Sequence, residues 1–140
     1  MRALSIRQPY AELILRGLKT IEYRSKPTKI IGERFWIYAT KTRAATRRSD
    51  DATRGIWSKD LSGAQPPPWI VELATAMELF EEKLPTGVIV GSAVIERVSP
   101  HAPRVNHQPF YQWHLSQVER VTRLRKPTRQ PQPVWFHPFD

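Results

Sequence analysis

Two neighbouring stretches near the N-terminus decide the fold: Leu-Ser-Ile-Arg-Gln-Pro-Tyr-Ala at residues 4–11 and Gly-Leu-Lys-Thr-Ile-Glu-Tyr-Arg at residues 17–24. Residues 3–7 alternate in polarity, which predicts a β-strand. Pro9 suits the first turn of a helix, because its missing N–H would have no partner there. Gly17 stands where a left-handed helix cap belongs, so the helix is short, about two turns. The β-branched and aromatic residues that follow predict a second strand.

Helical spacing predicts which side chains of this first helix face a core. They are Tyr10, Leu13, Ile14 and Leu18. Further along, residues 34–40 predict a strand that is apolar on both faces. The polar stretch that begins at Lys41 predicts a loop or frayed helix, and a proline-rich connector ends it near residue 68.

The second half of the chain predicts one helix and three strands. The helix spans residues 69–83 and combines an apolar stripe with an acidic face that carries Glu72, Glu78, Glu81 and Glu82. Strands are expected over residues 88–95, 113–122 and 134–136, with loops at 101–109 and 123–133. The resulting order, β-α-β-β-(α)-β-β-β, predicts an α+β fold: a small β-barrel of five to six strands flanked by two to three helices.

Composition sets the broad class. The 140 residues suit one domain, residues 1–140, with a polar insertion at about 41–68. A net charge of +9 favours a phosphate-rich partner such as nucleic acid. The chain has no cysteine, which excludes disulfides and thiolate metal sites. No apolar run reaches the ~18 residues of a membrane span, and the N-terminus lacks the apolar region of a signal peptide. A cytoplasmic location is therefore expected.

Residues 4–11 and 17–24 together closely resemble the signature of ASCH (activating signal cointegrator homology) domains. That family has a short helix, a Gly-x-Lys-x-x-Glu-x-Arg element, and then an apolar strand like residues 34–39. Residues 87–91, 113–115 and Trp135 continue the resemblance more weakly. The resemblance implies a PUA-like β-barrel with a cleft beside it that holds RNA or a modified base.

Several activities are compatible with this resemblance. The main expectation is an RNA- or nucleotide-binding domain that holds phosphate and base in a basic cleft. The alternative is an enzyme that uses Lys19, with a metal-independent ribonuclease preferred over a nucleoside amidohydrolase of the N4-acetylcytidine type. Amidohydrolases of the family use a nucleophilic threonine where this chain has Glu22. A third possibility is a protein-interaction module of a transcription coactivator, which would dock through the acidic helix at 69–83.

The expected cleft is framed by polar side chains from three predicted elements: Arg7, Gln8, Lys19, Glu22, Arg24 and Lys41. Cations would meet phosphate, while Glu22 or Gln8 would recognise a base edge. Lys19 could instead complement the helix dipole. On a strand Glu22 and Arg24 share a face, so they could equally pair with each other.

Catalysis would fall to Lys19, Glu22 and Tyr38, although Tyr38 could equally belong to the core. His114 and Ser116 share one face of a predicted strand and are further candidates to contact nucleic acid, although His114 could be a surface histidine. Trp57 is the aromatic residue best placed to stack on a base.

The basic stretch near the C-terminus adds Arg123, Arg125 and Lys126 as candidate phosphate contacts. The four histidines are scattered, so no metal site is expected. No cofactor is expected either.

Overall fold

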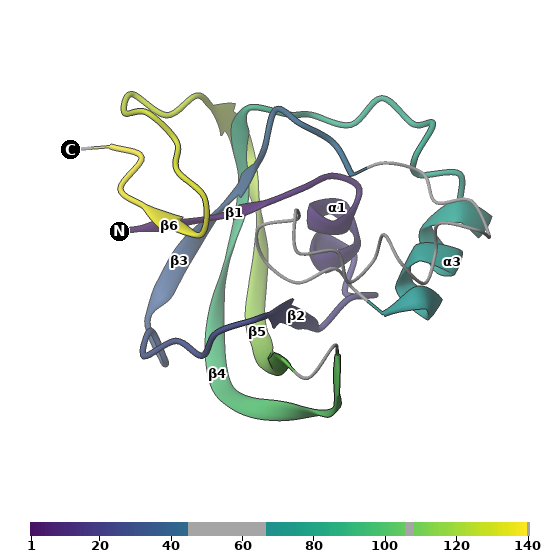
Figure 1. Cartoon of the computed structure of the whole chain (residues 1–140). Helices are drawn as coiled ribbons and strands as arrows, with labels where there is room; N and C mark the ends of the chain where they lie inside the picture. Colours follow the sequence, from purple (N-terminus) through teal and green to yellow (C-terminus); the bar gives the residue numbers. More distant parts are fainter. Residues whose placement is uncertain (45–66, 106–107, 140) are drawn as a thin grey trace.

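The structure is a computed structural model that describes residues 1–44, 67–105 and 108–139, so most of the expected polar insertion lies outside the described residues. In chain order, these residues form β1 (Ala3–Ile6), α1 (Tyr10–Leu15), β2 (Ile21–Arg24), β3 (Arg34–Ala39), α3 (Pro68–Ala76), β4 (Val88–Val105), β5 (Gln108–Arg125) and β6 (Trp135–Phe136). Their order confirms the predicted succession of strands and helices. The α+β class is confirmed as well (Figure 1).

All six strands belong to one sheet, in the order β2-β5-β4-β3-β1-β6. β1 pairs with β3 in parallel, and the other pairs are antiparallel. The pairing of β4 with β5 shifts register several times, which bends these two long strands (Figure 1). β2 and β6 stand at opposite edges. The described strands therefore form a curved sheet, and the predicted closure into a barrel is not made by their backbone pairing.

The predicted loop at residues 101–109 is wrong. β4 continues to Val105 and β5 begins at Gln108, so the two strands form one long hairpin. Proline residues predicted a loop here because proline cannot donate to a strand ladder. Pairing across the hairpin, as between His101 and Phe110, satisfies the remaining backbone groups and outweighs that local signal. For the same reason β5 extends to Arg125, into the second predicted loop.

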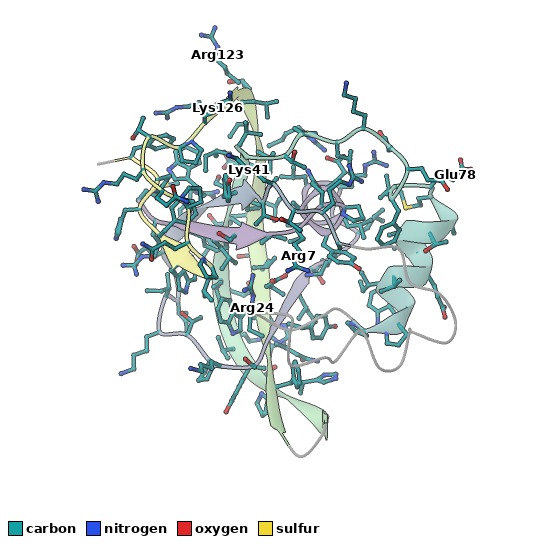
Figure 2. The ribbon with its side chains drawn as sticks, turned by 45° about the horizontal axis from the view of Figure 1, so that its top comes forward. Arg7, Arg24, Lys41, Glu78, Arg123 and Lys126 are labelled. Carbon is teal, nitrogen blue, oxygen red and sulfur yellow. The ribbon has the colours of Figure 1, made fainter. Side chains whose placement is uncertain are left out.

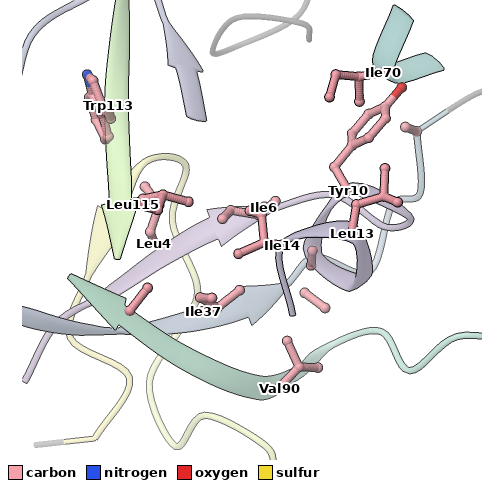
Figure 3. Close-up of a cluster of buried hydrophobic side chains, with 14 of the residues drawn as sticks. Leu4, Ile6, Tyr10, Leu13, Ile14, Ile37, Ile70, Val90, Trp113 and Leu115 are labelled. Atoms are coloured by element: carbon pink, nitrogen blue, oxygen red, sulfur yellow. The ribbon is translucent and has the colours of Figure 1, made fainter. Parts of the chain in front are cut away.

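The core lies between the curved sheet and α1 (Figure 3). Tyr10, Leu13 and Ile14 are buried there, as their spacing predicts, while Leu18 is exposed. Gly17 has a φ of +77° and turns the chain out of the helix, so Leu18 no longer follows the helical spacing. The amides of Leu18 and Lys19 both donate to the carbonyl of Leu13. This tight turn directs the Lys19 side chain inward.

The second helix is shorter than the predicted span of 69–83. α3 ends at Ala76 because Glu78 adopts a φ of +58°. The Glu78 amide then donates to Thr75, and the Leu79 amide donates to Ala74. This is a Schellman cap, and it buries Leu79 completely. Three of the four acidic residues of the predicted helix therefore lie beyond its end. No described helix is long and apolar enough to cross a membrane.

Candidate functional site

A buried ion-pair network joins the turn after α1 to strand β2. Lys19 Nζ lies 2.6 Å from Glu22 Oε1 and donates to the Ile21 carbonyl at 2.8 Å. Arg24 donates from Nε to Glu22 Oε2 at 2.8 Å, and its Nη2 lies 2.7 Å from the same oxygen. All three charged residues are buried, Lys19 to 3% exposure. The predicted pairing of Glu22 with Arg24 is thus confirmed, and the picture of Lys19 as an exposed charge at a helix end is wrong.

Burial and charge act in opposite directions within this network. Burial lowers the pKa of the Lys19 ammonium, although the Glu22 carboxylate opposes the change. Burial alone would raise the pKa of Glu22, but the positive charges of Lys19 and Arg24 prevail and the pKa is lowered overall. Glu22 is therefore a carboxylate with both oxygens occupied. Its two partners carry one more positive charge than it neutralises.

The network also ties the edge strand β2 to β1. Arg24 Nη2 donates to the Ser5 carbonyl at 2.9 Å, and the Arg24 guanidinium lies 5.7 Å from the centre of the Trp113 ring. Ser5 in turn holds the C-terminal segment: its amide donates to Val134 O at 2.9 Å and its hydroxyl to Gln132 O at 2.7 Å. Ser5 therefore connects the ion-pair network with residues 132–134.

A cleft of about 360 Å³ opens over the ion-pair network. Its lining comes from β1, the start of α1, strand β2 with Lys19 before it, the end of β3 with the residues after it, and the C-terminal segment. The lining residues are Ser5, Ile6, Arg7, Tyr10, Lys19, Glu22, Arg24, Tyr38, Thr40, Lys41, Thr42, Gln130, Pro131, Gln132, Pro133 and Val134. Four cationic side chains face one carboxylate, a surplus of three positive charges. Figure 2 shows Arg7, Arg24 and Lys41, which come from three separate parts of the chain. The cleft thus combines basic groups with two tyrosines.

Five of the six residues expected to frame the cleft line it, and Gln8 does not. Gln8 is fully buried: its Nε2 donates to Pro85 O at 3.0 Å, and its Oε1 accepts from the Glu12 amide at 3.0 Å. Tyr38 lines the cleft and is buried, with its ring edge-on to Phe136. Burial raises the pKa of the Tyr38 hydroxyl, which therefore keeps its proton at neutral pH.

His114 and Ser116 lie outside the cleft. They are half-buried on β5, while the alternating residues Trp113 and Leu115 belong to the core. They therefore share a face, as predicted, but it is the face turned away from the core. His114 Nε2 lies 2.8 Å from Ser99 Oγ, and burial lowers the pKa of the imidazole.

The basic residues near the C-terminus also lie outside the cleft lining. Arg123 and Arg125 are exposed on the last part of β5, and Lys126 follows them (Figure 2). The guanidinium of Arg125 lies 3.9 Å from the centre of the Phe139 ring. Arg125 pairs with Ile89 and the neighbouring Val88 with Ala39, so this end of β5 reaches the same end of the sheet as Lys41. Trp57 lies outside the described residues.

Sequence reasoning missed the wall formed by residues 130–134. These residues are distant in sequence from the other lining residues. Residues 130–133 were expected only as part of a basic loop, and Val134 as the start of the last strand. The available signal was the repeated Gln-Pro of residues 130–133, which indicates a stiff, polar segment. Nothing in its local pattern indicated what it packs against. Among the described residues, no group of three or more histidine, aspartate or glutamate side chains could hold a metal ion.

We expect the protein to lose stability in acid. The folded-state pKa values of Glu22 and Glu12 both lie below their ordinary value of 4.5. The stability that these carboxylates contribute is therefore complete above about pH 4.5 and is lost as the pH falls through their lower folded-state pKa values. Urea titrations at a series of pH values measure this effect. A free energy of unfolding that stayed constant from about pH 6 to pH 3 would contradict it.

Comparison with known proteins identifies one matching protein family and one similar solved structure. A family model described as "ASCH domain" matches residues 4–125. The crystal structure of ASCH from Zymomonas mobilis superimposes with a TM-score of 0.57 at 14% sequence identity. The match covers 97% of this chain and 85% of that chain, and at this identity it shows the fold alone. No curated protein matches the sequence.

Proposed function

Because the chain belongs to the ASCH domain family, we propose that it binds RNA or a nucleotide in the cleft over the Lys19–Glu22–Arg24 network. The observation that carries the proposal is the charge of the cleft: Arg7, Lys19, Arg24 and Lys41 against Glu22 alone. Phosphate oxygens bind to such groups by charge-assisted hydrogen bonds. The +9 charge of the whole chain would attract the same ligand over a longer range.

The two kinds of cation in the cleft have different tasks in this proposal. Lys19 and Arg24 are buried and already share Glu22, so they supply a fixed positive field at the floor. Arg7 is half-buried and Lys41 is exposed. The aliphatic chain of Lys41 packs where a side chain on Gly87 would stand, which supports its position beside the cleft. Direct phosphate contacts are therefore assigned to Arg7 and Lys41.

Substitution of Lys41 with Met tests the proposal. We expect the dissociation constant for labelled single-stranded RNA to rise severalfold. The slope of its logarithm against the logarithm of salt concentration should fall by about 0.7, the value for one lost phosphate contact on a single strand. Lys29→Met is the matched control, since Lys29 is exposed and lies outside the cleft. If wild-type protein retains no RNA at low salt, or if both variants bind like wild type, the proposal fails.

The same incubation distinguishes binding from catalysis. An enzymatic alternative draws support from Lys19, because burial lowers the pKa of its ammonium and a lysine that loses its proton more readily can act as a base. Against it, Lys19 donates to Glu22 and Ile21, Glu22 has both oxygens occupied, and Tyr38 keeps its proton. Intact RNA after prolonged incubation supports binding alone. Cleavage that disappears in Lys19→Met while the fold persists supports the ribonuclease.

The proposal extends to the architecture, which we assign to the PUA-like barrels. Its support is the contact between Arg24 on the edge strand β2 and the Ser5 carbonyl on β1. β1 is next to the other edge of the sheet, so this contact spans the two sides of the curved sheet. The hydrogen bond from the Arg24 side chain, rather than backbone pairing between strands, joins the two sides of the sheet. The cleft floor and the sheet closure would thus depend on the same guanidinium.

A further inference from the structure

The cleft needs a group that recognises the ligand's base, and the two residues expected for this task are engaged elsewhere. Gln8 is fully buried and uses both ends of its amide within the protein. Glu22 accepts from Lys19 with one oxygen and from Arg24 with the other. Both groups are buried and already bonded within the protein, so a base would have to compete with bonds that are already made. A different residue of the cleft is therefore better suited to contact the base.

The C-terminal wall supplies two candidates, Gln130 and Gln132. Both residues line the cleft and both are exposed. Neither amide side chain has a hydrogen-bond partner among the described residues. Two hydroxyl groups of the lining, by contrast, are occupied: Ser5 Oγ donates to Gln132 O and Thr40 Oγ1 to Thr42 O. These two amides therefore combine a vacant donor with a vacant acceptor at the cleft surface.

The wall holds Gln132 in a defined position. Pro131 and Pro133 flank it, and each restricts the backbone to a narrow range of φ. The hydroxyl and the amide of Ser5 bind the carbonyls of Gln132 and Val134. Val134 has a φ of +66°, a value that is rare for a β-branched residue, so tertiary contacts must determine this backbone. A residue that recognises a base benefits from such a fixed position, because a mobile amide side chain loses conformational entropy when it binds.

We infer that Gln132, with Gln130 beside it, recognises the base of the bound nucleotide through paired amide hydrogen bonds. This inference rests on the proposed function and names its specificity determinant. A carboxamide offers a donor next to an acceptor, and so does the edge of every nucleobase, whereas an abasic sugar has no such edge. The cations of the cleft would take the phosphate, and the uncharged side chains of residues 130–134 would take the base. The ligand class is therefore a nucleotide unit with an intact base.

The test compares wild type with Gln132→Leu, a change that keeps the size of the side chain and removes the donor and the acceptor. The probes are short labelled oligoribonucleotides of a single base type (A, C, G or U) and an abasic oligomer of the same length. Wild type should bind its preferred base at least about tenfold more tightly than the abasic oligomer. In Gln132→Leu this ratio should fall towards one while the affinity for the abasic oligomer stays unchanged.

Two controls separate base recognition from other effects. Gln117→Leu makes the same exchange at an exposed glutamine outside the cleft; it removes the contact between Gln117 Oε1 and Arg34 Nη2 but should keep the wild-type ratio. Lys41→Met should weaken binding to all probes equally, because a phosphate contact does not depend on the base. If Gln132→Leu keeps the wild-type ratio, or if wild type binds the abasic oligomer as well as the others, the inference is overturned while the proposed function stands. If wild type binds none of the probes, both fall.

Discussion

Replacing Glu22 with Gln is expected to lower the free energy of unfolding by about 3–5 kcal/mol, the cost of removing one partner from a buried ion pair. Glu22 is the single carboxylate between Lys19 and Arg24, and all three residues are buried. Without its charge, two cations would remain close together with no compensating anion. Their desolvation would then oppose folding directly. Urea titration monitored by circular dichroism measures the change.

The matched control is Glu33→Gln. Glu33 also pairs with an arginine, Arg2, at 3.7 Å, but its side chain is 52% exposed. An exposed pair contributes about 1 kcal/mol or less, so this variant should remain close to wild type. The Glu22 variant should melt on the order of 10 °C lower than wild type. Equal stability of the two variants would mean that Glu22 is not the centre of the network.

Replacing Gly91 with Ala is expected to cost about 3 kcal/mol of folding free energy. A Cβ atom on Gly91 would stand 2.5 Å from the Glu119 carbonyl oxygen and 2.5 Å from Leu15 Cδ2. The leucine can rotate, but the carbonyl belongs to β5 and cannot move without disturbing its pairing with β4. The close approach of α1 to the hairpin therefore requires glycine at this position.

Gly32→Ala provides the comparison for this prediction. Nothing lies within 4 Å of a Cβ at Gly32, but its φ of +77° would strain an alanine. Backbone strain of this kind costs about 1 kcal/mol. Thermal unfolding of both variants separates steric overlap from backbone strain. If Gly91→Ala unfolds at the same temperature as Gly32→Ala, overlap with the Glu119 carbonyl of β5 does not add to the loss of stability.

A second ion-pair cluster joins α1 to strand β5 of the same hairpin. The guanidinium of Arg120 donates to both oxygens of the buried Glu12, each at 3.0 Å, and Arg16 Nε lies 2.7 Å from Glu12 Oε2. Glu12 also receives its position from Gln8, which accepts from the Glu12 amide. Gln8 therefore stabilises helix α1. Its burial explains why this residue of the family motif does not line the cleft.

Local sequence patterns were sufficient for the order of the elements. Pro9 and Gly17 delimit a short helix, and the alternation of residues 3–7 predicts the strand that precedes it. The spacing of Glu22 and Arg24 predicted a shared face and offered their pairing as one of two alternatives, and the structure shows the pair. Each of these features depends on residues only a few positions apart, because the helix repeats every 3.6 residues and the strand every two. The sequence by itself therefore determined the order of the elements and the shared face of Glu22 and Arg24.

Tertiary structure alone decided what surrounds that centre. Lys19 is buried because the turn at Gly17 carries it under β1, and Gln8 is enclosed because Pro85 lies across from it. The predicted loop at 101–109 became a hairpin through pairing between distant strands. Gln132 reached the cleft because Ser5, 127 positions earlier, binds its carbonyl. Contacts between residues so far apart leave no periodic trace in the sequence, since they depend on how the whole sheet curves.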